Sequence, residues 1–118
     1  MPRNKLIGKK AEDVACSFLQ RQGMQVLARN YHCRYGEIDL IMNDTDTIVF
    51  VEVRYRSSAA YGDAIDSVDT KKQRRLIFTA NHYLQSLEQL QPCRFDVVAL
   101  SPNNSPEWIS DAFRDSYT

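Results

Sequence analysis

Cysteine is scarce in this chain of 118 residues, and its three copies, Cys16, Cys33 and Cys93, are widely separated. An odd count at such spacing does not give a disulfide framework, so we expect a reducing compartment, the cytoplasm. The longest apolar run, Thr47 to Val53, is too short to cross a bilayer. Residues 1–10 lack the apolar stretch of a secretory signal. We therefore expect no contact with a membrane.

Zinc-binding pairs and phosphate-binding loops are also lacking. His32 and Cys33 are adjacent, but no second pair follows at the interval of a zinc site. The sequence has no glycine-rich phosphate loop. Its length fits a single domain over residues 1–118, which would bury roughly two-thirds of the surface of the unfolded chain. Such a domain needs neither a disulfide nor a structural metal in order to fold.

Net charge is absent as well, so the overall charge does not indicate a nucleic-acid-binding protein. The distribution is uneven: residues 37–70 carry eight acidic and two basic side chains, whereas residues 1–36 carry seven basic and two acidic. Residues 71–94 carry five basic and one acidic. A metal site facing a phosphate backbone needs carboxylates between positive charges. Taken alone, however, this pattern is better explained by chance.

The hydrophobic pattern predicts the order α-β-β-β-α-β, followed by a short strand or an extended tail. Apolar residues at helical spacing, Val14 among them, indicate a first helix that Gly23 ends. Thr70 and Gln73 have the spacing of a capping box at the start of the second helix. The predicted elements cover residues 5–22, 24–31, 37–42, 47–56, 70 onward, 94–100 and 107–113.

The second and third strands would place four charged side chains on one face. Because side chains alternate along a strand, Glu37 shares a face with Asp39, and Glu52 shares one with Arg54. A hairpin connection over residues 44–47 would set Asp39 directly opposite Glu52. It would set Glu37 opposite Arg54, with Cβ atoms about 4.5–5.5 Å apart.

Two opposed carboxylates repel each other unless a cation lies between them. Mg²⁺, or Mn²⁺ in its place, is commonly held by one or two carboxylates and the phosphates of a substrate. Asp39 and Glu52 are therefore candidate metal ligands, and the main-chain carbonyl of Val53 could add a third. The alternative is that Glu52 forms a salt bridge with Arg54 or Arg56 and that no metal is involved.

Three segments of the chain, residues 36–41, 50–56 and 94–98, resemble the signature blocks of the YraN family of small bacterial proteins. They read Gly-Glu-Ile-Asp-Leu-Ile, Phe-Val-Glu-Val-Arg-Tyr-Arg and Arg-Phe-Asp-Val-Val. The resemblance runs from about residue 10 to residue 113. That family in turn resembles the PD-(D/E)XK nucleases, especially archaeal Holliday-junction resolvases. The resemblance implies a restriction-endonuclease-like α/β fold: a three-layer α-β-β-β-α-β core whose central mixed sheet is flanked by helices.

The same resemblance implies roles for individual residues. Asp39 corresponds to the first metal-binding acid, Glu52 to the second, and Glu12 in the first helix to an additional acid. An equally good explanation of Glu12 is a solvated carboxylate near the start of a helix. Arg54 stands where the pattern has lysine. Arginine stays protonated, so Arg54 could clamp a phosphate or stabilise negative charge but could not easily act as a base.

Four basic side chains crowd the first turns of the second helix: Lys71, Lys72, Arg74 and Arg75. Each opposes the helix dipole by roughly 0.3–1 kcal/mol, unless a phosphate lies nearby. The resemblance also places a Lys-Gln pair at Lys72 and Gln73. We expect Lys72 to contact a nucleic-acid backbone, with Gln73, Arg74, Arg75 and Arg56 as further candidates. The alternative for most of them is a solvated basic face.

Aromatic residues near these motifs offer a second kind of contact. Tyr35, Tyr55 and Tyr61 could stack on bases, although packing in the core or at its rim is the better expectation for each. Trp108 is expected to pack at the edge of the sheet.

The sequence thus predicts a Mg²⁺- or Mn²⁺-dependent endonuclease that cuts the DNA backbone, with branched DNA as the substrate that the resemblance implies. Asp39 and Glu52 would bind the metal, while Glu12, Glu37 and Arg54 would assist. A homodimer is expected, because cutting two strands of a junction needs two sites. Two alternatives are a nucleic-acid-binding module that does not cut, which Arg54 favours, and an accessory protein whose acidic face binds another protein.

Overall fold

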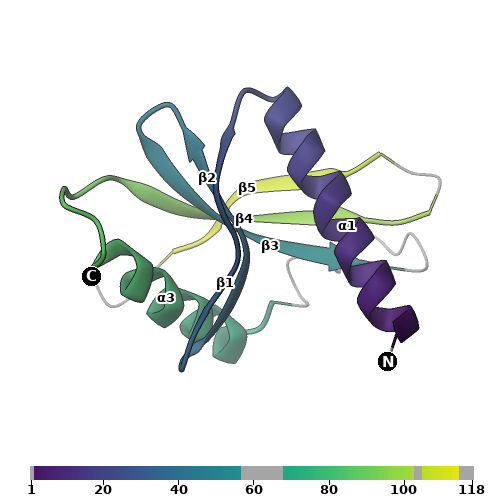
Figure 1. Ribbon diagram of the computed structural model, residues 1–118, viewed down its shortest axis with the longest axis horizontal. Coiled ribbons are helices and arrows are strands. Elements are labelled where there is room, and N and C mark those ends of the chain that lie inside the picture. The colour runs from purple at the N-terminus through teal and green to yellow at the C-terminus, as the bar shows by residue number, and fades with distance from the viewer. Residues whose placement is uncertain (1, 57–67, 103–104, 115–118) are drawn as a thin grey trace.

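The computed structural model describes residues 2–56, 68–102 and 105–114 (Figure 1). A five-stranded mixed sheet lies between two helices, and the strand order is β1-β2-β3-β4-β5. The element order confirms the predicted α/β class and is consistent with a restriction-endonuclease-like fold. The elements are α1 (Pro2–Arg21), β1 (Gln25–Cys33), β2 (Gly36–Asp44), β3 (Thr47–Tyr55), α3 (Thr70–Leu84), β4 (Cys93–Leu100) and β5 (Glu107–Phe113).

The sheet combines a meander with one crossover. β1, β2 and β3 are successive antiparallel neighbours, β4 is parallel to β3, and β5 is antiparallel to β4. Two parallel strands need a long connection, and here that connection contains α3. The predicted last strand is confirmed as β5. Trp108 lies on this edge strand and meets Phe18 of α1 edge-to-face, with ring centroids 6.2 Å apart.

Helix α1 packs through one row of small and apolar side chains. Ala11, Ala15 and Leu19 follow each other at intervals of four residues and are buried. Val14 was predicted to lie in the same stripe, but it is 49% exposed because the contact follows the narrower i, i+4 row. Gly23, with φ of 97°, follows the helix as predicted. Within the described ranges, neither helix could cross a membrane.

The start of α3 differs from the prediction. The N-cap is Asp69, whose side chain accepts a hydrogen bond of 2.8 Å from the backbone N–H of Lys72. Thr70 is the first helical residue, so the predicted capping box of Thr70 and Gln73 is wrong. The side-chain amide of Gln73 instead donates a hydrogen bond of 2.9 Å to the carbonyl of Val68. Aspartate caps helices better than threonine does, which accounts for the shift of one residue.

Each face of the sheet carries its own hydrophobic core. Leu40 lies in the core beneath α1, and Ile38 and Ile41 lie in the core beneath α3. In a regular strand Ile38 and Leu40 would share a face. The alternation is therefore interrupted at Asp39, between them. Beside this point, Asn30 of β1 has φ of 52°, a left-handed conformation that asparagine tolerates.

Candidate metal and phosphate site

The β2–β3 hairpin brings Asp39 against β3. In this described hairpin the paired residues run from Asp44–Thr47 to Leu40–Val51, and they include the predicted pair of Asn43 and Ile48. One step further, Asp39 Oδ2 accepts a hydrogen bond of 2.8 Å from the backbone N–H of Val53. A side chain thus joins the two strands next to Glu52. Because the alternation is interrupted at Asp39, the simple rule by which Asp39 and Glu37 were predicted to share a face does not hold here.

The surroundings of Asp39 disfavour its negative charge. Burial raises the pKa of this carboxyl to about 8 from the ordinary value of 3.8, and the charge of Glu52 adds to the rise. The hydrogen bond from Val53 acts in the opposite direction, and Glu12 and Glu37 contribute smaller increases. At neutral pH the carboxyl therefore keeps a proton, which an exposed aspartate would have lost. A cation at this position could take the place of that proton.

Glu52 is almost completely buried, at 5% exposure, and lies on the α3 side of β3. Its Oε2 atom is 2.7 Å from Lys72 Nζ and 3.4 Å from Arg54 Nε. A salt bridge with Arg54 was one of the sequence alternatives, whereas the contact with Lys72 was not foreseen. Both cations are closest to the same carboxylate oxygen. The backbone N–H of Arg56, the other predicted partner, donates to the carbonyl of Leu100 at 2.8 Å.

Glu12 and Glu37 both lie close enough to act on Asp39 electrostatically. Glu12 Oε1 accepts a hydrogen bond of 2.8 Å from Asn30 Nδ2, and it lies 3.9 Å from Arg29 Nη2. Because β1 adopts a left-handed conformation at Asn30, Glu12 ties α1 to an irregular part of the sheet. Glu37 is exposed on β2. The structure therefore places both predicted assisting acids around Asp39.

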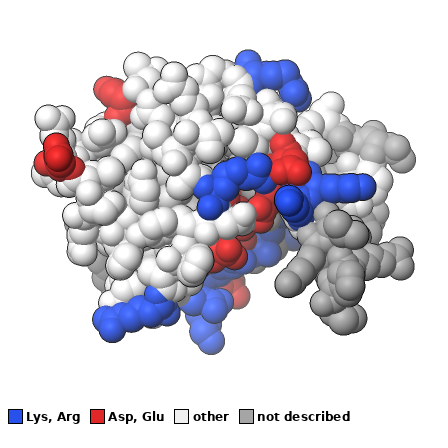
Figure 2. Space-filling model, viewed as in Figure 1, with Lys and Arg blue, Asp and Glu red and all other residues white. Residues whose placement is uncertain are grey.

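The basic residues of α3 divide into two groups. Lys72 and Gln73 are partly buried and engaged with Glu52 and Val68, respectively. Arg74 and Arg75, which were predicted as weaker phosphate contacts, are exposed, and so is Lys71. Figure 2 shows acidic side chains surrounded by basic ones between the places that α3 and α1 occupy in Figure 1. The site thus combines acids at its centre with cations at its rim.

Among the tyrosines considered for stacking on bases, Tyr61 lies outside the described residues.

Comparison with known proteins places this arrangement in a family. Residues 11–100 match the profile of Uncharacterised protein family UPF0102. The chain belongs to this family. UPF0102 is the YraN family, so the resemblance found in the sequence is confirmed.

UPF0102 proteins from several bacteria resemble the chain over nearly its whole length. The protein from Nitrosococcus oceani is 52% identical over 91% of this chain and 90% of its own. The protein from Nitrosomonas europaea is 54% identical over 92% of this chain and 94% of its own. The protein from Psychromonas ingrahamii is 50% identical over 92% and 89%, respectively.

The donor set of this UPF0102 chain suits a magnesium ion better than a closed metal site. Among the described residues, no group of three or more His, Cys, Asp or Glu side chains could hold a metal ion. Asp39 and Glu52 supply two carboxylates. The N–H of Val53 faces Asp39, and the N–H and C=O of a strand residue point to the same side, so its carbonyl also points toward β2. Mg²⁺ commonly takes this few protein ligands and completes its shell with water and phosphate oxygens.

Proposed function

We propose that this protein is a metal-dependent endonuclease that hydrolyses the phosphodiester backbone of DNA. The observation that carries the proposal is the state of Asp39, whose pKa is raised to about 8 by burial and by the charge of Glu52. Two acids held together in this way repel each other when both are ionised, and a divalent cation relieves that repulsion. Stability of the fold alone does not explain why Asp39 and Glu52 lie together beside the basic start of α3.

Asp39, Glu52 and the carbonyl of Val53 would hold Mg²⁺ or Mn²⁺. The bound metal would supply a Lewis acid for a phosphoryl oxygen and a water of lowered pKa. The chain's own residues would position the scissile phosphate. The exposed cations Lys71, Arg74 and Arg75 line the approach along α3, where a helix N-terminus also attracts anions.

The nuclease pattern has a lysine at the position of Arg54. In this chain Lys72, from α3, supplies an amine next to Glu52 instead. Its Nζ atom lies 2.7 Å from Glu52 Oε2. An ammonium on a flexible stem can shift from Glu52 to a phosphate or to an attacking water, and lysine can change protonation state, which arginine does not. Arg54, 3.4 Å from the same oxygen, would stabilise negative charge that develops on the phosphate.

The test is cleavage of branched, duplex and single-stranded DNA with and without Mg²⁺ or Mn²⁺. We expect metal-dependent cutting that Asp39→Asn abolishes, since this variant keeps an acceptor for Val53 but cannot ionise to bind the metal. The matched control is Asp46→Asn. Asp46 is exposed at the turn of the β2–β3 hairpin, and its carboxylate accepts a hydrogen bond from the hydroxyl of its neighbour Thr47. Light scattering would show whether two copies associate, as cutting both strands of a junction requires. Absence of metal-dependent cleavage on every substrate would refute the proposal.

A second candidate function is a binding module that grips nucleic acid without cutting it. The observation that favours it is the engagement of Glu52 Oε2 by both Lys72 and Arg54, which neutralises this acid without a metal. Such a module would bind DNA with an affinity that falls as salt rises. It would show no cleavage with any metal ion, and Asp39→Asn would leave its affinity for DNA unchanged.

A further inference from the structure

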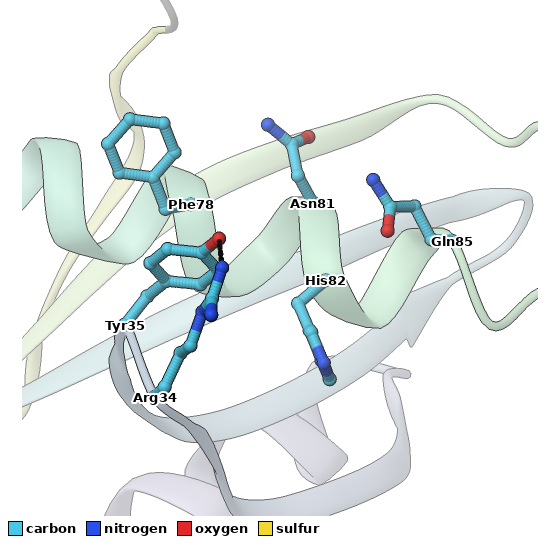
Figure 3. Close-up of a pocket in the computed structure, with 6 residues that line it drawn as sticks. All are labelled: Arg34, Tyr35, Phe78, Asn81, His82 and Gln85. Atoms are coloured by element: carbon cyan, nitrogen blue, oxygen red, sulfur yellow. Dashed lines mark hydrogen bonds between the residues drawn. The ribbon is translucent and has the colours of Figure 1, made fainter.

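A pocket of about 490 Å³ lies between α3 and the turn that joins β1 to β2. The turn contributes a cation and an aromatic ring, and α3 with its C-cap residue contributes one ring, two amides and an imidazole (Figure 3). The lining residues are Arg34, Tyr35, Phe78, Asn81, His82 and Gln85. The site described above uses none of them.

Two aromatic rings form one wall of this pocket and are open to solvent. Tyr35 is 39% exposed and Phe78 is 48% exposed, and their ring centroids are 5.6 Å apart at an interplanar angle of 35°. The guanidinium of Arg34 lies over the Tyr35 ring, 4.9 Å from its centroid, and donates a hydrogen bond of 2.8 Å to the Tyr35 hydroxyl. Flat π-faces next to a cation are the surfaces on which nucleobases stack.

Side chains further along α3 can form hydrogen bonds with the polar edge of a base that stacks on these rings. Asn81 and Gln85 are exposed, and each amide carries both donors and acceptors. Figure 3 shows these amides on the same helix as Phe78. His82 is fixed by a hydrogen bond between its Nδ1 and the hydroxyl of Tyr31. A base has the flat face and the mixed polar edge that such a pocket complements.

The turn is held close to the helix, so the pocket is formed before any ligand enters. Gly36 follows Tyr35, and a Cβ atom at Gly36 would lie 3.3 Å from Thr79 Oγ1. Thr79 is fully buried, and its hydroxyl donates to the carbonyl of Arg75 at 2.8 Å. A glycine at this position lets the β1–β2 turn approach α3 closely enough for Tyr35 to meet Phe78.

The pocket and the candidate metal site share one helix. Phe78 lies six residues after Lys72, which is about 9 Å along the helix axis, and Gln85 lies about 20 Å along it. The exposed residues between them follow one stripe, from Lys71 through Arg74 and Arg75 to Phe78. A nucleic-acid strand whose phosphates contact the basic part of this stripe would place its next bases at the pocket.

We propose that this pocket binds an unpaired base of the nucleic-acid strand whose backbone lies at the Asp39–Glu52 site. The position of that strand rests on the proposed function. A base within a duplex is covered by its neighbours on both sides, so only a single-stranded end, flap or branch point can insert a base here. The substrate class that follows is DNA with an unpaired segment next to the cut.

The test measures binding in EDTA, with all variants made in an Asp39→Asn background to prevent cleavage. The probes are a blunt duplex and the same duplex with a single-stranded end that carries the fluorescent base 2-aminopurine. We expect Phe78→Ala to weaken binding of the second probe about 5- to 150-fold, the range for the loss of one base–aromatic stack, and to reduce the quenching of the probe. Binding of the blunt duplex should be unchanged.

Two further variants separate stacking from other effects. Phe78→Leu keeps an apolar side chain without a π-face, so it should lose most of the quenching. Leu27→Ala removes a side chain of similar exposure, 45%, at the far end of β1, and should bind both probes as the background protein does. Equal losses on both probes, or none in Phe78→Ala, overturn the proposal even where cleavage by the unmodified protein is observed. Selective loss on the second probe supports the base pocket even where no cleavage occurs.

Discussion

Lys72 Nζ and Glu52 Oε2 are 2.7 Å apart, so an ion pair ties the first turn of α3 to the centre of β3. The two ends differ in exposure, since the side chain of Glu52 is 6% exposed and that of Lys72 is 33% exposed. With Asp39 protonated and Arg54 nearby, the site is close to electrically balanced without a metal. A divalent cation that binds Glu52 must therefore compete with the amine of Lys72.

Replacing Lys72 by methionine separates the structural role of the amine from its competition with a metal. We expect Lys72→Met to lower the free energy of unfolding by about 1–3 kcal/mol, because a buried carboxylate loses its shortest ion pair while Arg54 stays close. We also expect it to bind Mn²⁺ more tightly. Denaturant unfolding and calorimetric titration measure these effects. Lys71→Met, an exposed change in the same helical turn, is the control, and equal behaviour of the two variants would contradict the prediction.

Arg54 and Lys72 should differ sharply in their effect on cleavage. If Lys72 provides the amine of the site, Arg54→Lys should cut DNA within a few fold of the unmodified rate. Lys72→Met should cut about a hundred- to a thousandfold more slowly, as removal of one charge-stabilising donor does in other enzymes. Single-turnover rates at saturating Mg²⁺ distinguish this loss from weaker binding. A large gain in Arg54→Lys would instead assign the amine's role to position 54.

Local patterns were enough to predict most of the fold. Polar turn residues fix the length of the β2–β3 hairpin, so the pair Asn43–Ile48 followed from counting. The pattern over Glu107–Phe113 fits either a strand or an extended tail. Its place at the edge of the sheet depends on pairing with β4, which is a tertiary contact.

The site was predicted less completely, for two physical reasons. The alternation rule fails at Asp39 because the backbone of the neighbouring strand turns left-handed at Asn30, and no pattern within β2 indicates this. Lys72 was predicted to contact a nucleic-acid backbone, and its contact with Glu52 was not foreseen, yet it lies four residues before Leu76 and eight before Ala80, in the buried row of α3. That spacing was present in the sequence and could have indicated that its amine points at the sheet.

Asp96 is a buried acid whose role is structural. At 1% exposure its carboxylate accepts hydrogen bonds from Arg94 Nε at 3.1 Å, from Trp108 Nε1 at 2.9 Å and from the backbone N–H of Asp111 at 2.9 Å. We expect Asp96→Asn to lower the free energy of unfolding by about 2–4 kcal/mol, because its NH₂ group would face one of these donors. Denaturant unfolding followed by Trp108 fluorescence measures this. Cleavage at low temperature, where the variant is folded, should be retained, and a specific loss of cleavage would contradict a purely structural role.

The protonation of Asp39 predicts how stability varies with pH. Between its ordinary pKa of 3.8 and the raised value of about 8, the folded protein holds a proton that the unfolded chain has released. The contribution of Asp39 to stability therefore falls as pH rises through this window and is constant above it. Asp39→Asn does not titrate, so its stability relative to the unmodified protein should increase from about pH 5 to pH 8 in EDTA.

Mg²⁺ should reverse this trend in the unmodified protein. Because a cation binds the ionised carboxylate, it competes with the proton, and the gain in stability on adding Mg²⁺ should grow up to about pH 8, the raised pKa of Asp39. Asp39→Asn should show little gain at any pH. Denaturant midpoints at a series of pH values, with EDTA or Mg²⁺, measure both effects. Identical pH profiles for the two proteins in EDTA would mean that Asp39 is ionised at neutral pH. The repulsion that a metal is proposed to relieve would then be too weak to raise the pKa of Asp39.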